Sequence, residues 1–479
     1  MKIHRAIPDG PTIRGTAALA ARWLPLALGL VLSFAAHAAP AKPNLIFILA
    51  DDQGIGEVGC YGSKVVPTPN IDRLAAEGMR FTRAYSGSAV CAPTRNVLMT
   101  GLHTGHGTRR ANMSKHGLIS LAPDEITVAE KLKEAGYATG GFGKWGLGNP
   151  GTTGVPEQQG FDQWYGYYDQ VHAHSFFPLY LVRNSAEEKL AGNRPAGTKL
   201  AKGVGTDYSA DLILKETLAF ITAHKDRPFF CYAAWTLPHG DFEVPAIAPD
   251  FVGQPWSEEI KTHATMLQRL DRDVGTLMKT LRDLGLDQNT LVIYTSDNGA
   301  AGPGGATFNA SGGLRGAKRD LREGGIRAPF IARWPGKIRA GTTSDTLTSH
   351  VDWMATACDL AGVKPPKTDG LSLAPIFLGK PAPSQHEHLY WEIYEGPVPF
   401  QQAVRLGDWK GYRTALRGPL ELHDLARDPV EKNNVAAEHP AVVARIEAIM
   451  AAEHVRNPNW DPVESPPAPG ATGKKRKNK

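Results

Sequence analysis

Short apolar runs alternate with amphipathic stretches along most of the chain. Residues 42–50 contain a continuous apolar run, the pattern of a parallel strand that is covered on both faces. Similar runs occur at 137–142, 228–235, 290–295 and 328–333. Helical periodicity separates these runs and is longest at 262–284. The alternation predicts an α/β fold with a large, doubly wound, mostly parallel sheet flanked by helices.

Local signals place several helix ends. Thr127-Val-Ala-Glu130 has the form of a capping box before a helix at 131–135. Asn70 is a candidate N-cap for a helix at 71–77. A further helix is expected to begin near Thr94, because Pro93 fixes the backbone just before it.

Polar residues follow several of the predicted strands. These residues are Asp51 and Asp52, Lys144, His239, and Asp297 with Asn298. In open α/β sheets, ligands bind beyond the carboxyl ends of the strands. We therefore expect these side chains to converge at one edge of the sheet, although they are far apart in the sequence.

Changes in composition divide the chain into parts. A catalytic α/β domain is predicted over 43–363, in which residues 149–205 lack clear periodicity and are rich in Gly, Pro and aromatic residues. An irregular connection of this length is usually functional, so we interpret 149–205 as an insertion or lid. Residues 364–457 are expected to form a smaller C-terminal subdomain with an antiparallel sheet and a packed helix. Residues 458–479 are expected to be a disordered basic tail.

The 479 residues are 42% hydrophobic and 21% charged, which is typical of a globular enzyme with more than one core. The net charge of +5 belongs to the ends of the chain: residues 1–38 carry a net +3 and the last six residues carry five positive charges. The remaining body is therefore acidic. This distribution argues against nucleic acid as a partner.

The first 38 residues have the pattern of a signal peptide. Two arginines precede an apolar stretch at 23–36, and Ala36-His37-Ala38 fits a small-x-small cleavage site. We expect cleavage after Ala38 and a periplasmic or secreted protein without a stable membrane anchor. An uncleaved anchor is the alternative, although the apolar stretch is short for a membrane span. The four cysteines do not resemble a disulfide scaffold or a zinc site.

Four oxygen-bearing side chains at two strand ends form a candidate metal site: Asp51, Asp52, Asp297 and Asn298. Such hard ligands suit Ca²⁺ or Mg²⁺ rather than zinc. The alternative is that each residue only caps a loop, as Asp and Asn at strand ends often do.

The segment Cys91-Ala-Pro-Thr-Arg95 places a cysteine at the positive end of a predicted helix. A buried structural thiol is the simplest alternative. The pattern, however, resembles the signature of the type I sulfatases, the formylglycine-dependent, arylsulfatase-like family within the alkaline-phosphatase-like superfamily. Further segments carry the same resemblance: Thr68–Met79, Gly143–Trp145, Asp297–Gly299, Glu323–Pro329 and Leu420–Leu425.

The resemblance implies that Cys91 is converted to formylglycine (3-oxoalanine) by a formylglycine-generating enzyme. In the family, one oxygen of the hydrated aldehyde attacks sulfur and displaces the alcohol. The second hydroxyl then loses its proton and expels sulfate, which regenerates the aldehyde, a form of covalent catalysis. It also implies Ca²⁺, held by the oxygen-bearing set named above and completed by the modified side chain of Cys91 and by the sulfate of the substrate.

Further roles follow from the resemblance residue by residue. Arg95 would hold the diol and balance charge. Lys144 and Lys318 match lysines that bind the sulfate oxygens and stabilise charge as the S–O bond breaks. His239 matches the histidine that protonates the leaving oxygen. Taken alone, each lysine would be a surface residue and His239 a packed one.

One position departs from the family pattern. Many members have a histidine directly after the Lys-Trp pair, where this chain has Gly146. We hypothesise that His174, or else His172, from the aromatic insertion takes the place of that histidine near the substrate. His103 and His106 are interpreted as structural.

The sequence therefore predicts a sulfuric ester hydrolase that acts on a sulfated small molecule or glycan. A phosphomonoester or phosphodiester hydrolase of the same superfamily is one alternative. A catalytically idle sulfated-glycan-binding protein, with Cys91 unconverted, is another. Aromatic side chains of the insertion would suit stacking on sugar faces, but they are equally suited to a core.

Overall fold

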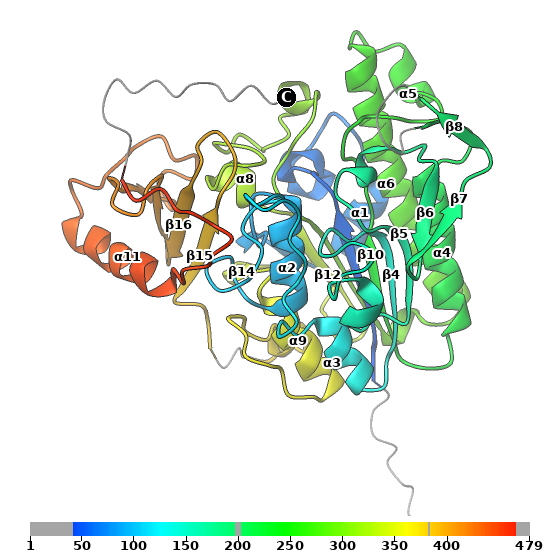
Figure 1. The fold of residues 1–479 in the computed structure, drawn as a ribbon, viewed down its shortest axis with the longest axis horizontal. Helices are drawn as coiled ribbons and strands as arrows, with labels where there is room; N and C mark the ends of the chain where they lie inside the picture. Colours follow the sequence, from blue (N-terminus) through cyan, green and yellow to red (C-terminus); the bar gives the residue numbers. More distant parts are fainter. Residues whose placement is uncertain (1–41, 197–202, 382–383, 466–479) are drawn as a thin grey trace, which may run out of the picture. The chain divides into compact units, whose positions relative to one another are not determined.

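A ten-stranded mixed sheet organises the structure (Figure 1). In this computed structural model, its central strands β11, β1, β10, β4 and β5 are parallel, and antiparallel pairs occur on both sides of them. The doubly wound α/β fold with a large, mostly parallel sheet is confirmed. In order across the sheet, the strands are β13 (Thr342–Ser344), β2 (Met79–Phe81), β12 (Phe330–Arg333), β11 (Thr290–Ser296), β1 (Asn44–Ala50), β10 (Phe229–Ala234), β4 (Ala138–Lys144), β5 (Gln163–Tyr167), β6 (Tyr180–Arg183) and β7 (Ala186–Lys189).

The structure describes residues 42–196, 203–381 and 384–465. The described residues belong to one compact unit. The predicted signal peptide and the last fourteen residues of the predicted tail lie outside the described residues. Within the described ranges, no helix is long and apolar enough to cross a membrane.

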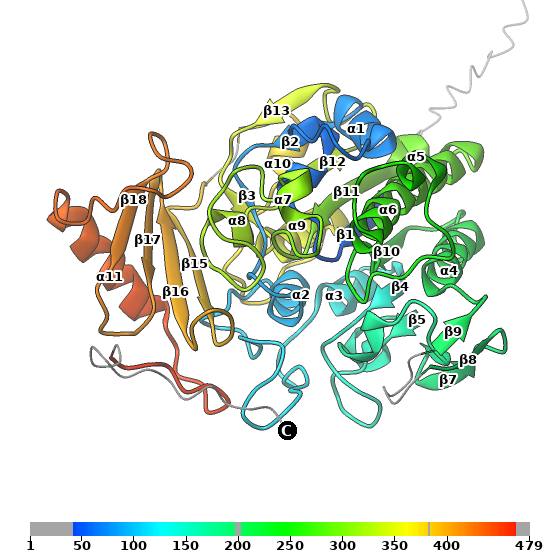
Figure 2. The same cartoon turned by 90° about the horizontal axis from the view of Figure 1, so that it is seen from above.

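Strand β1 shows why the sheet is covered on both faces. Leu45, Phe47 and Leu49 belong to one buried cluster with side chains of α2, α3 and α9. The alternate residues Ile46 and Ile48 belong to a second cluster with α1, α4 and α6 (Figure 2). Because successive side chains of a strand point to opposite faces, one apolar run feeds two cores.

Six longer helices cover the sheet: α1 (Pro69–Ala76), α2 (Cys91–Thr100), α3 (Val128–Glu134), α4 (Ser209–Ala223), α6 (Glu258–Asp283) and α9 (Asp352–Ala361). Thr127 caps α3 as predicted, since its hydroxyl accepts from the Glu130 N–H at 3.2 Å and its own N–H donates to the Glu130 carboxylate at 2.7 Å. Helix α1 begins at Pro69, one residue before the predicted cap Asn70.

Among the described residues, the large domain also has four short α-helices, five 3-10 helices and two small strand pairs. The short α-helices are α5 (Pro249–Val252), α7 (Gly305–Phe308), α8 (Glu323–Ile326) and α10 (Ala374–Phe377). The pairs are β3 (Ala84–Tyr85) with β14 (Thr348–Ser349), and β8 (Asn193–Pro195) with β9 (Gly203–Gly205).

The aromatic segment 149–205 contributes to the core. Its strand β5 pairs with β4 in the central sheet, and β6 and β7 extend that sheet. Trp164, Tyr165, Tyr167 and Phe176 are fully or almost fully buried. Of the two alternatives for these aromatic rings, the core is confirmed for these four and sugar stacking is not, because other apolar side chains already cover their faces.

The C-terminal part is a four-stranded antiparallel sheet with one helix against it. Its elements are β15 (His388–Ile393), β16 (Gln401–Leu406), β17 (Trp409–Arg413), β18 (Glu421–Asp424) and α11 (Pro440–Glu453). The expectation that disorder begins at residue 458 is wrong for 458–465. The Leu416 N–H donates to the Val463 carbonyl at 2.8 Å, and Trp460 is buried with its indole N–H on the Thr108 carbonyl.

A cluster of histidines and carboxylates joins α11 to the large domain. The Gly105 N–H donates to His103 Nδ1 at 3.1 Å, which leaves the His103 proton on Nε2, where Glu453 accepts it at 3.0 Å. His106 Nδ1 lies 2.9 Å from Asp369, and His388 Nε2 lies 3.0 Å from Glu453. The Nδ1 lone pair of His103, which a metal ion would need, already accepts the Gly105 N–H. We therefore describe the cluster as a hydrogen-bonded junction and not as a metal site.

Glu453 should stabilise the protein through this junction. Its hydrogen bond to His103 is the largest of the causes that lower its pKa, from 4.5 to about 2. A lowered carboxyl pKa stabilises the folded state above the unfolded value and loses this effect as pH falls through the folded value. We expect Glu453→Gln to cost about 1–3 kcal/mol at pH 7, and the difference from the unmutated protein to shrink below about pH 4.

The measurement is the unfolding temperature at pH 7, 5 and 3.5. Glu447→Gln, on the exposed face of the same helix, is the control and should leave it unchanged. Equal destabilisation by the two variants would contradict the role of the junction.

Candidate active site

Cys91 is the first residue of α2, and every residue of this helix is buried. The helix begins three residues before the predicted start at Thr94, because Pro93 fits within a first turn, where its missing N–H costs nothing. Gly101 ends the helix with φ 70°, a left-handed conformation that favours glycine. The thiol is therefore fixed at the positive end of a buried helix.

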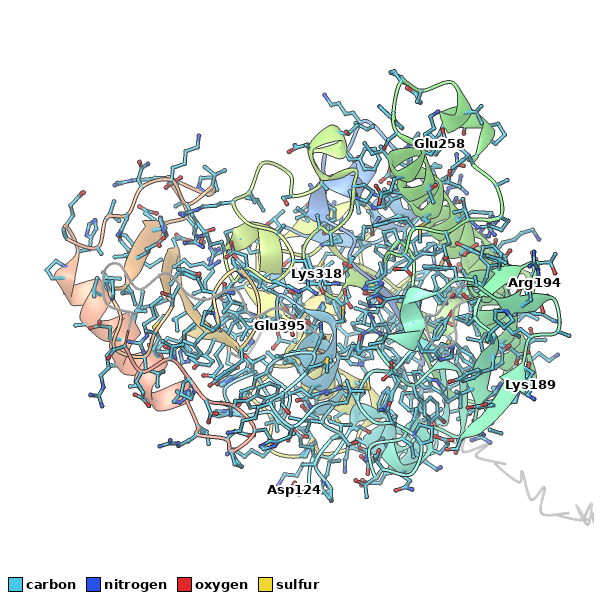
Figure 3. All side chains as sticks on the ribbon, turned by 45° about the horizontal axis from the view of Figure 1, so that its top comes forward. Asp124, Lys189, Arg194, Glu258, Lys318 and Glu395 are labelled. Carbon is cyan, nitrogen blue, oxygen red and sulfur yellow. The ribbon has the colours of Figure 1, made fainter. Side chains whose placement is uncertain are left out.

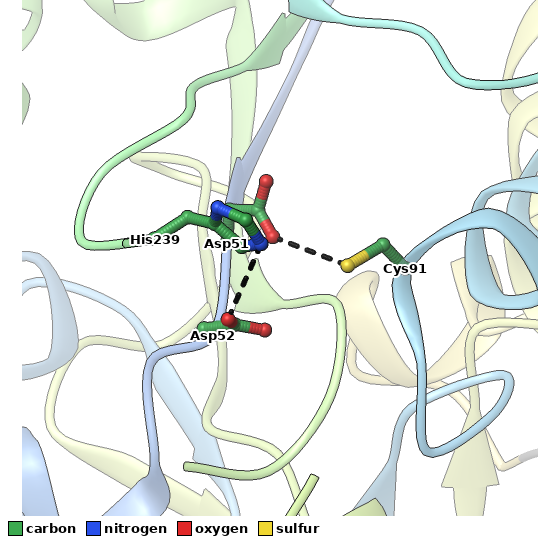
Figure 4. Close-up of side chains that lie close together, drawn as sticks. All are labelled: Asp51, Asp52, Cys91 and His239. Carbon is green, nitrogen blue, oxygen red and sulfur yellow. Dashed lines mark hydrogen bonds and ion pairs between the residues drawn. The ribbon is translucent and has the colours of Figure 1, made fainter. Parts of the chain in front are cut away.

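The Cys91 thiol faces the ends of two strands. Its Sγ lies 3.5 Å from Asp51 Oδ1, and Figure 4 shows Asp52 and His239 beside the same group. Burial raises the pKa of the thiol well above its ordinary value. Because the thiolate is the nucleophilic form, an unmodified Cys91 would be a poor nucleophile at neutral pH.

Strand pairing brings the acidic residues together. Ala50 is paired with Ser296 in the register of β1 and β11, so the residues that follow these two strands are neighbours. The Asp52 N–H donates to Asp297 Oδ1 at 3.0 Å, and Asn298 Nδ2 donates to Asp52 Oδ1 at 2.8 Å. The predicted convergence at the carboxyl ends of the strands therefore occurs.

Three cations lie among these carboxylates. Lys144, the last residue of β4, places Nζ 2.8 Å from Asp51 Oδ2. Lys318 Nζ lies 2.7 Å from the Asp52 carboxylate. Arg95 donates to Asp297 Oδ2 at 2.9 Å and to the Lys144 carbonyl at 2.6 Å. The site thus holds three acidic and three basic side chains, which is the arrangement that makes buried charge tolerable.

The pKa is shifted in different directions for the three carboxyl groups. Burial raises the pKa of Asp51, but Lys144, His239, Arg95 and Lys318 outweigh it and hold the pKa well below its usual range. The pKa of Asp52 is also lowered, because Lys318 and His239 together overcome its burial. Burial and the charge of Asp51 raise the pKa of Asp297 to about 7. Without a further cation, the three carboxylates are therefore not fully ionised at neutral pH.

His239 follows β10 after Pro238 and reaches the same group. Its Nε2 lies 3.5 Å from Asp52 Oδ2, and its Nδ1 has no hydrogen-bond partner within the described part of the chain. Burial and the neighbouring Lys144 lower the pKa of His239 to about 3. The imidazole is therefore neutral at pH 7 while the site holds no anion.

The oxygen set fits a hard divalent cation. Asn298 Oδ1 is buried and has no donor among the described residues, although its Nδ2 is bonded. A buried amide oxygen left without a partner is costly unless something else binds it. With Asp51, Asp52 and Asp297 it completes a group of oxygen ligands of the kind that Ca²⁺ and Mg²⁺ prefer.

The surroundings of Gly146 were not foreseen from the sequence. A Cβ on this glycine would lie 1.9 Å from Gln170 Nε2, so Gln170 is the side chain next to the position of the absent histidine. The His174 ring lies 4.5 Å from that of His239, which places it at the site. His172 is buried against Tyr167 and Tyr180. A role for His174 in the reaction stays a prediction.

Asn112 is another residue at the site that the sequence did not indicate. Its Oδ1 accepts from the Ala92 N–H at 3.0 Å and so satisfies one of the free donors at the start of α2. No motif marks this contact, which joins residues that only the folded chain brings together.

Comparison with known proteins agrees with the site. Residues 43–363 match the family described as Sulfatase, and residues 316–455 match the one described as N-sulphoglucosamine sulphohydrolase, C-terminal. Human arylsulfatase A is 33% identical, over 88% of this chain and 90% of its own. An N-acetylgalactosamine-6-O-sulfatase of Bacteroides thetaiotaomicron is 31% identical, over 87% of this chain and 94% of its own.

A solved structure, Ps i-CgsB, superposes with a TM-score of 0.77 at 28% identity and covers 88% of this chain and 94% of its own. A second structure of Ps i-CgsB is a complex with k-i-k-neocarrahexaose. The chain belongs to the sulfatase family and is a sulfuric ester hydrolase.

The oxygen set predicts stabilisation by a divalent cation. Saturating Ca²⁺ or Mg²⁺, compared with a chelator, should raise the unfolding temperature of the protein, since a ligand at 100 times its Kd adds about 2.7 kcal/mol. Asn298→Leu, which keeps the size of the side chain but removes the oxygen, should lose most of this gain. Asn433→Leu, at an exposed position, is the control. An equal gain in both variants would argue against Asn298 as a ligand.

Proposed function

We propose that the protein hydrolyses a sulfate monoester on a sulfated glycan, with formylglycine formed from Cys91 and with Ca²⁺ at the oxygen set. The observation that carries this proposal is the position of Cys91. The residue starts a buried helix and points its side chain at a carboxylate 3.5 Å away, inside a ring of three acidic and three basic groups.

Conversion of Cys91 to formylglycine would replace a buried thiol that is a poor nucleophile. The pKa of the thiol is raised by burial, so it is protonated and unreactive in the place where a nucleophile is needed. Hydrated formylglycine would supply two hydroxyls, one to attack sulfur and displace the alcohol and one whose deprotonation would release the sulfate. The relatives compared above belong to the same family and support this reading.

Lys144, Lys318 and Arg95 would provide the positive charge that a sulfate ester needs. In the structure each is paired with one of the site carboxylates. With Ca²⁺ bound to those carboxylates, the two lysine ammonium groups would be free to donate to the sulfate oxygens and to stabilise charge as the S–O bond breaks. Arg95, held by the Lys144 carbonyl, would keep its position.

His239 would protonate the leaving oxygen. Its low pKa belongs to the site without a substrate anion, where burial and Lys144 both disfavour the imidazolium. A bound sulfate ester would place negative charge beside the ring and raise that pKa. His239 is therefore expected to become protonated when the substrate binds and then to donate this proton to the departing alcohol.

Two relatives support a glycan as the substrate class. One is a sulfatase named for N-acetylgalactosamine, and the other was solved with a carrageenan-type hexaose. Export through the predicted signal peptide, to the periplasm or outside the cell, is part of the same proposal because polymeric glycans are met there.

A matched pair of esters tests the reaction. We expect the protein to hydrolyse the sulfate monoester of one alcohol at least tenfold faster, by kcat/KM, than its phosphate monoester, because the chain belongs to the sulfatase family. Release of the alcohol is measured for both esters and for the phosphodiester. Preference for either phosphate ester would favour the rival phosphoester hydrolase.

The state of Cys91 is tested by the mass of the tryptic peptide Ala84–Arg95 from protein made together with a formylglycine-generating enzyme. We expect an aldehyde in place of the thiol, and activity that rises with the converted fraction. Cys91→Ala should be inactive and fold normally. Full activity with an intact thiol would overturn the mechanism, and complete conversion without hydrolysis of any sulfate ester would favour the glycan-binding alternative.

A further inference from the structure

The connection between β15 and β16 in the C-terminal part reaches the active site. It begins at Tyr394, whose N–H donates to the Arg110 carbonyl at 3.0 Å, and it contains Glu395. Figure 3 labels Glu395 and Lys318, and the residue after Lys318 is a direct partner of Glu395. The carboxylate of Glu395 has contacts on two sides of the site.

On one side, Glu395 fixes the start of α2. Its Oε2 accepts the Asn112 N–H at 2.6 Å. The Asn112 amide in turn accepts the Ala92 N–H at 3.0 Å through Oδ1. Ala92 directly follows Cys91, so two hydrogen bonds connect Glu395 to the backbone beside the reactive residue.

On the other side, Glu395 holds the loop that carries Lys318. Arg319 Nε donates to Glu395 Oε1 at 3.1 Å. Arg319 has φ 75°, a conformation that a non-glycine residue adopts only when its surroundings hold it. Its N–H donates to the Ala89 carbonyl, two residues before Cys91, at 2.8 Å.

The backbone of the connection between β15 and β16 also packs closely against the loop that carries Lys318. Gly396 has φ 120°, and a Cβ there would lie 2.2 Å from the Arg319 carbonyl oxygen. Gln401 Nε2 donates to the same carbonyl at 2.8 Å and to the Glu395 carbonyl at 3.2 Å. This close approach leaves the loop little freedom to move away from the connection.

We infer that Glu395 is a positioning residue: it sets the separation between Cys91 and Lys318, the nucleophile precursor and a sulfate-binding cation of the proposed reaction. The expected effect on catalysis rests on the proposed function, whereas the connection between the two segments does not. The C-terminal part thus acts on the site through this connection, and the Glu395 side chain is 21% exposed.

The test compares Glu395→Ala with Glu387→Ala, a highly exposed glutamate of the same subdomain whose partner is Arg445. Misplacement of a reacting group by about 1 Å can cost up to about a hundredfold in rate, so we expect kcat for an aryl sulfate to fall about tenfold to a hundredfold in Glu395→Ala. KM should change far less, since Lys144 and the cation site are untouched. Glu387→Ala should equal the unmutated protein.

Two further variants separate positioning from general stability. Glu395→Gln keeps an acceptor for the Asn112 N–H and should recover part of kcat. Asn112→Ala breaks the same connection at its other end, and combining it with Glu395→Ala should cost no more than the larger single effect. Each variant is normalised for its converted fraction of Cys91, and its unfolding temperature is measured.

Hydrogen exchange gives a readout that does not need activity. Amide exchange in a peptide containing Ala92 should be at least tenfold faster in Glu395→Ala than in Glu387→Ala. Unchanged exchange together with unchanged kcat would overturn the inference. If no variant, nor the unmutated protein, hydrolyses a sulfate ester, the proposed function fails. The exchange rate then decides the inference alone: faster exchange supports the connection, and unchanged exchange refutes it.

Discussion

The structure depends on burying six charged side chains in one place. Asp51, Asp297, Arg95 and Lys144 have fully buried side chains, and those of Asp52 and Lys318 are at most one-tenth exposed. Each isolated charge would cost several kcal/mol to bury, so the arrangement is stable only because every member faces an opposite charge. The register of β1 and β11 is the geometric condition for this balance, since a shift by one residue would turn the acidic pairs to opposite faces.

The balance also explains why the residues of the site fit a cation. Burial, together with the charges of Asp51 and Asp52, raises the pKa of Asp297 to about 7. The amide oxygen of Asn298 has no donor among the described residues. A divalent ion would ionise Asp297 fully and satisfy that oxygen. It would also weaken the hold of Asp51 and Asp52 on the two lysines, which would then be available to an anionic substrate.

Much of this arrangement could be predicted from the sequence, and the reasons are local. The apolar runs predict the parallel strands, and the polar residues directly after those strands predict the edge where they meet. The capping box at Thr127 is a short-range signal and occurs as expected. Lys318 is different: it lies in an irregular loop, and only the resemblance to the family indicated that it belongs to the site.

What the sequence did not indicate depends on contacts between distant residues. The aromatic residues of 149–205 have no clear period, so the sequence could not decide between sugar stacking and core. Most of them are core because β5 pairs with β4. Residues 458–465 have the composition of a tail, yet Trp460 is buried by the connection after β15 and by the segment near Thr108. Asn112 and Glu395 are separated by 283 residues and no local pattern joins them.

Gly146 shows how backbone and site constrain each other. Its φ of 77° lies in the left-handed region, and its missing Cβ would overlap Gln170 Nε2. A histidine at this position would therefore strain the backbone and require Gln170 to move, so the family's usual residue cannot simply be restored here. The Gly146 carbonyl is also fixed, because the buried Arg109 donates to it. In the proposed mechanism, any group that assists the modified Cys91 in place of that histidine must come from outside this turn. His174, on the short 3-10 helix His172–His174, already packs its ring against that of His239.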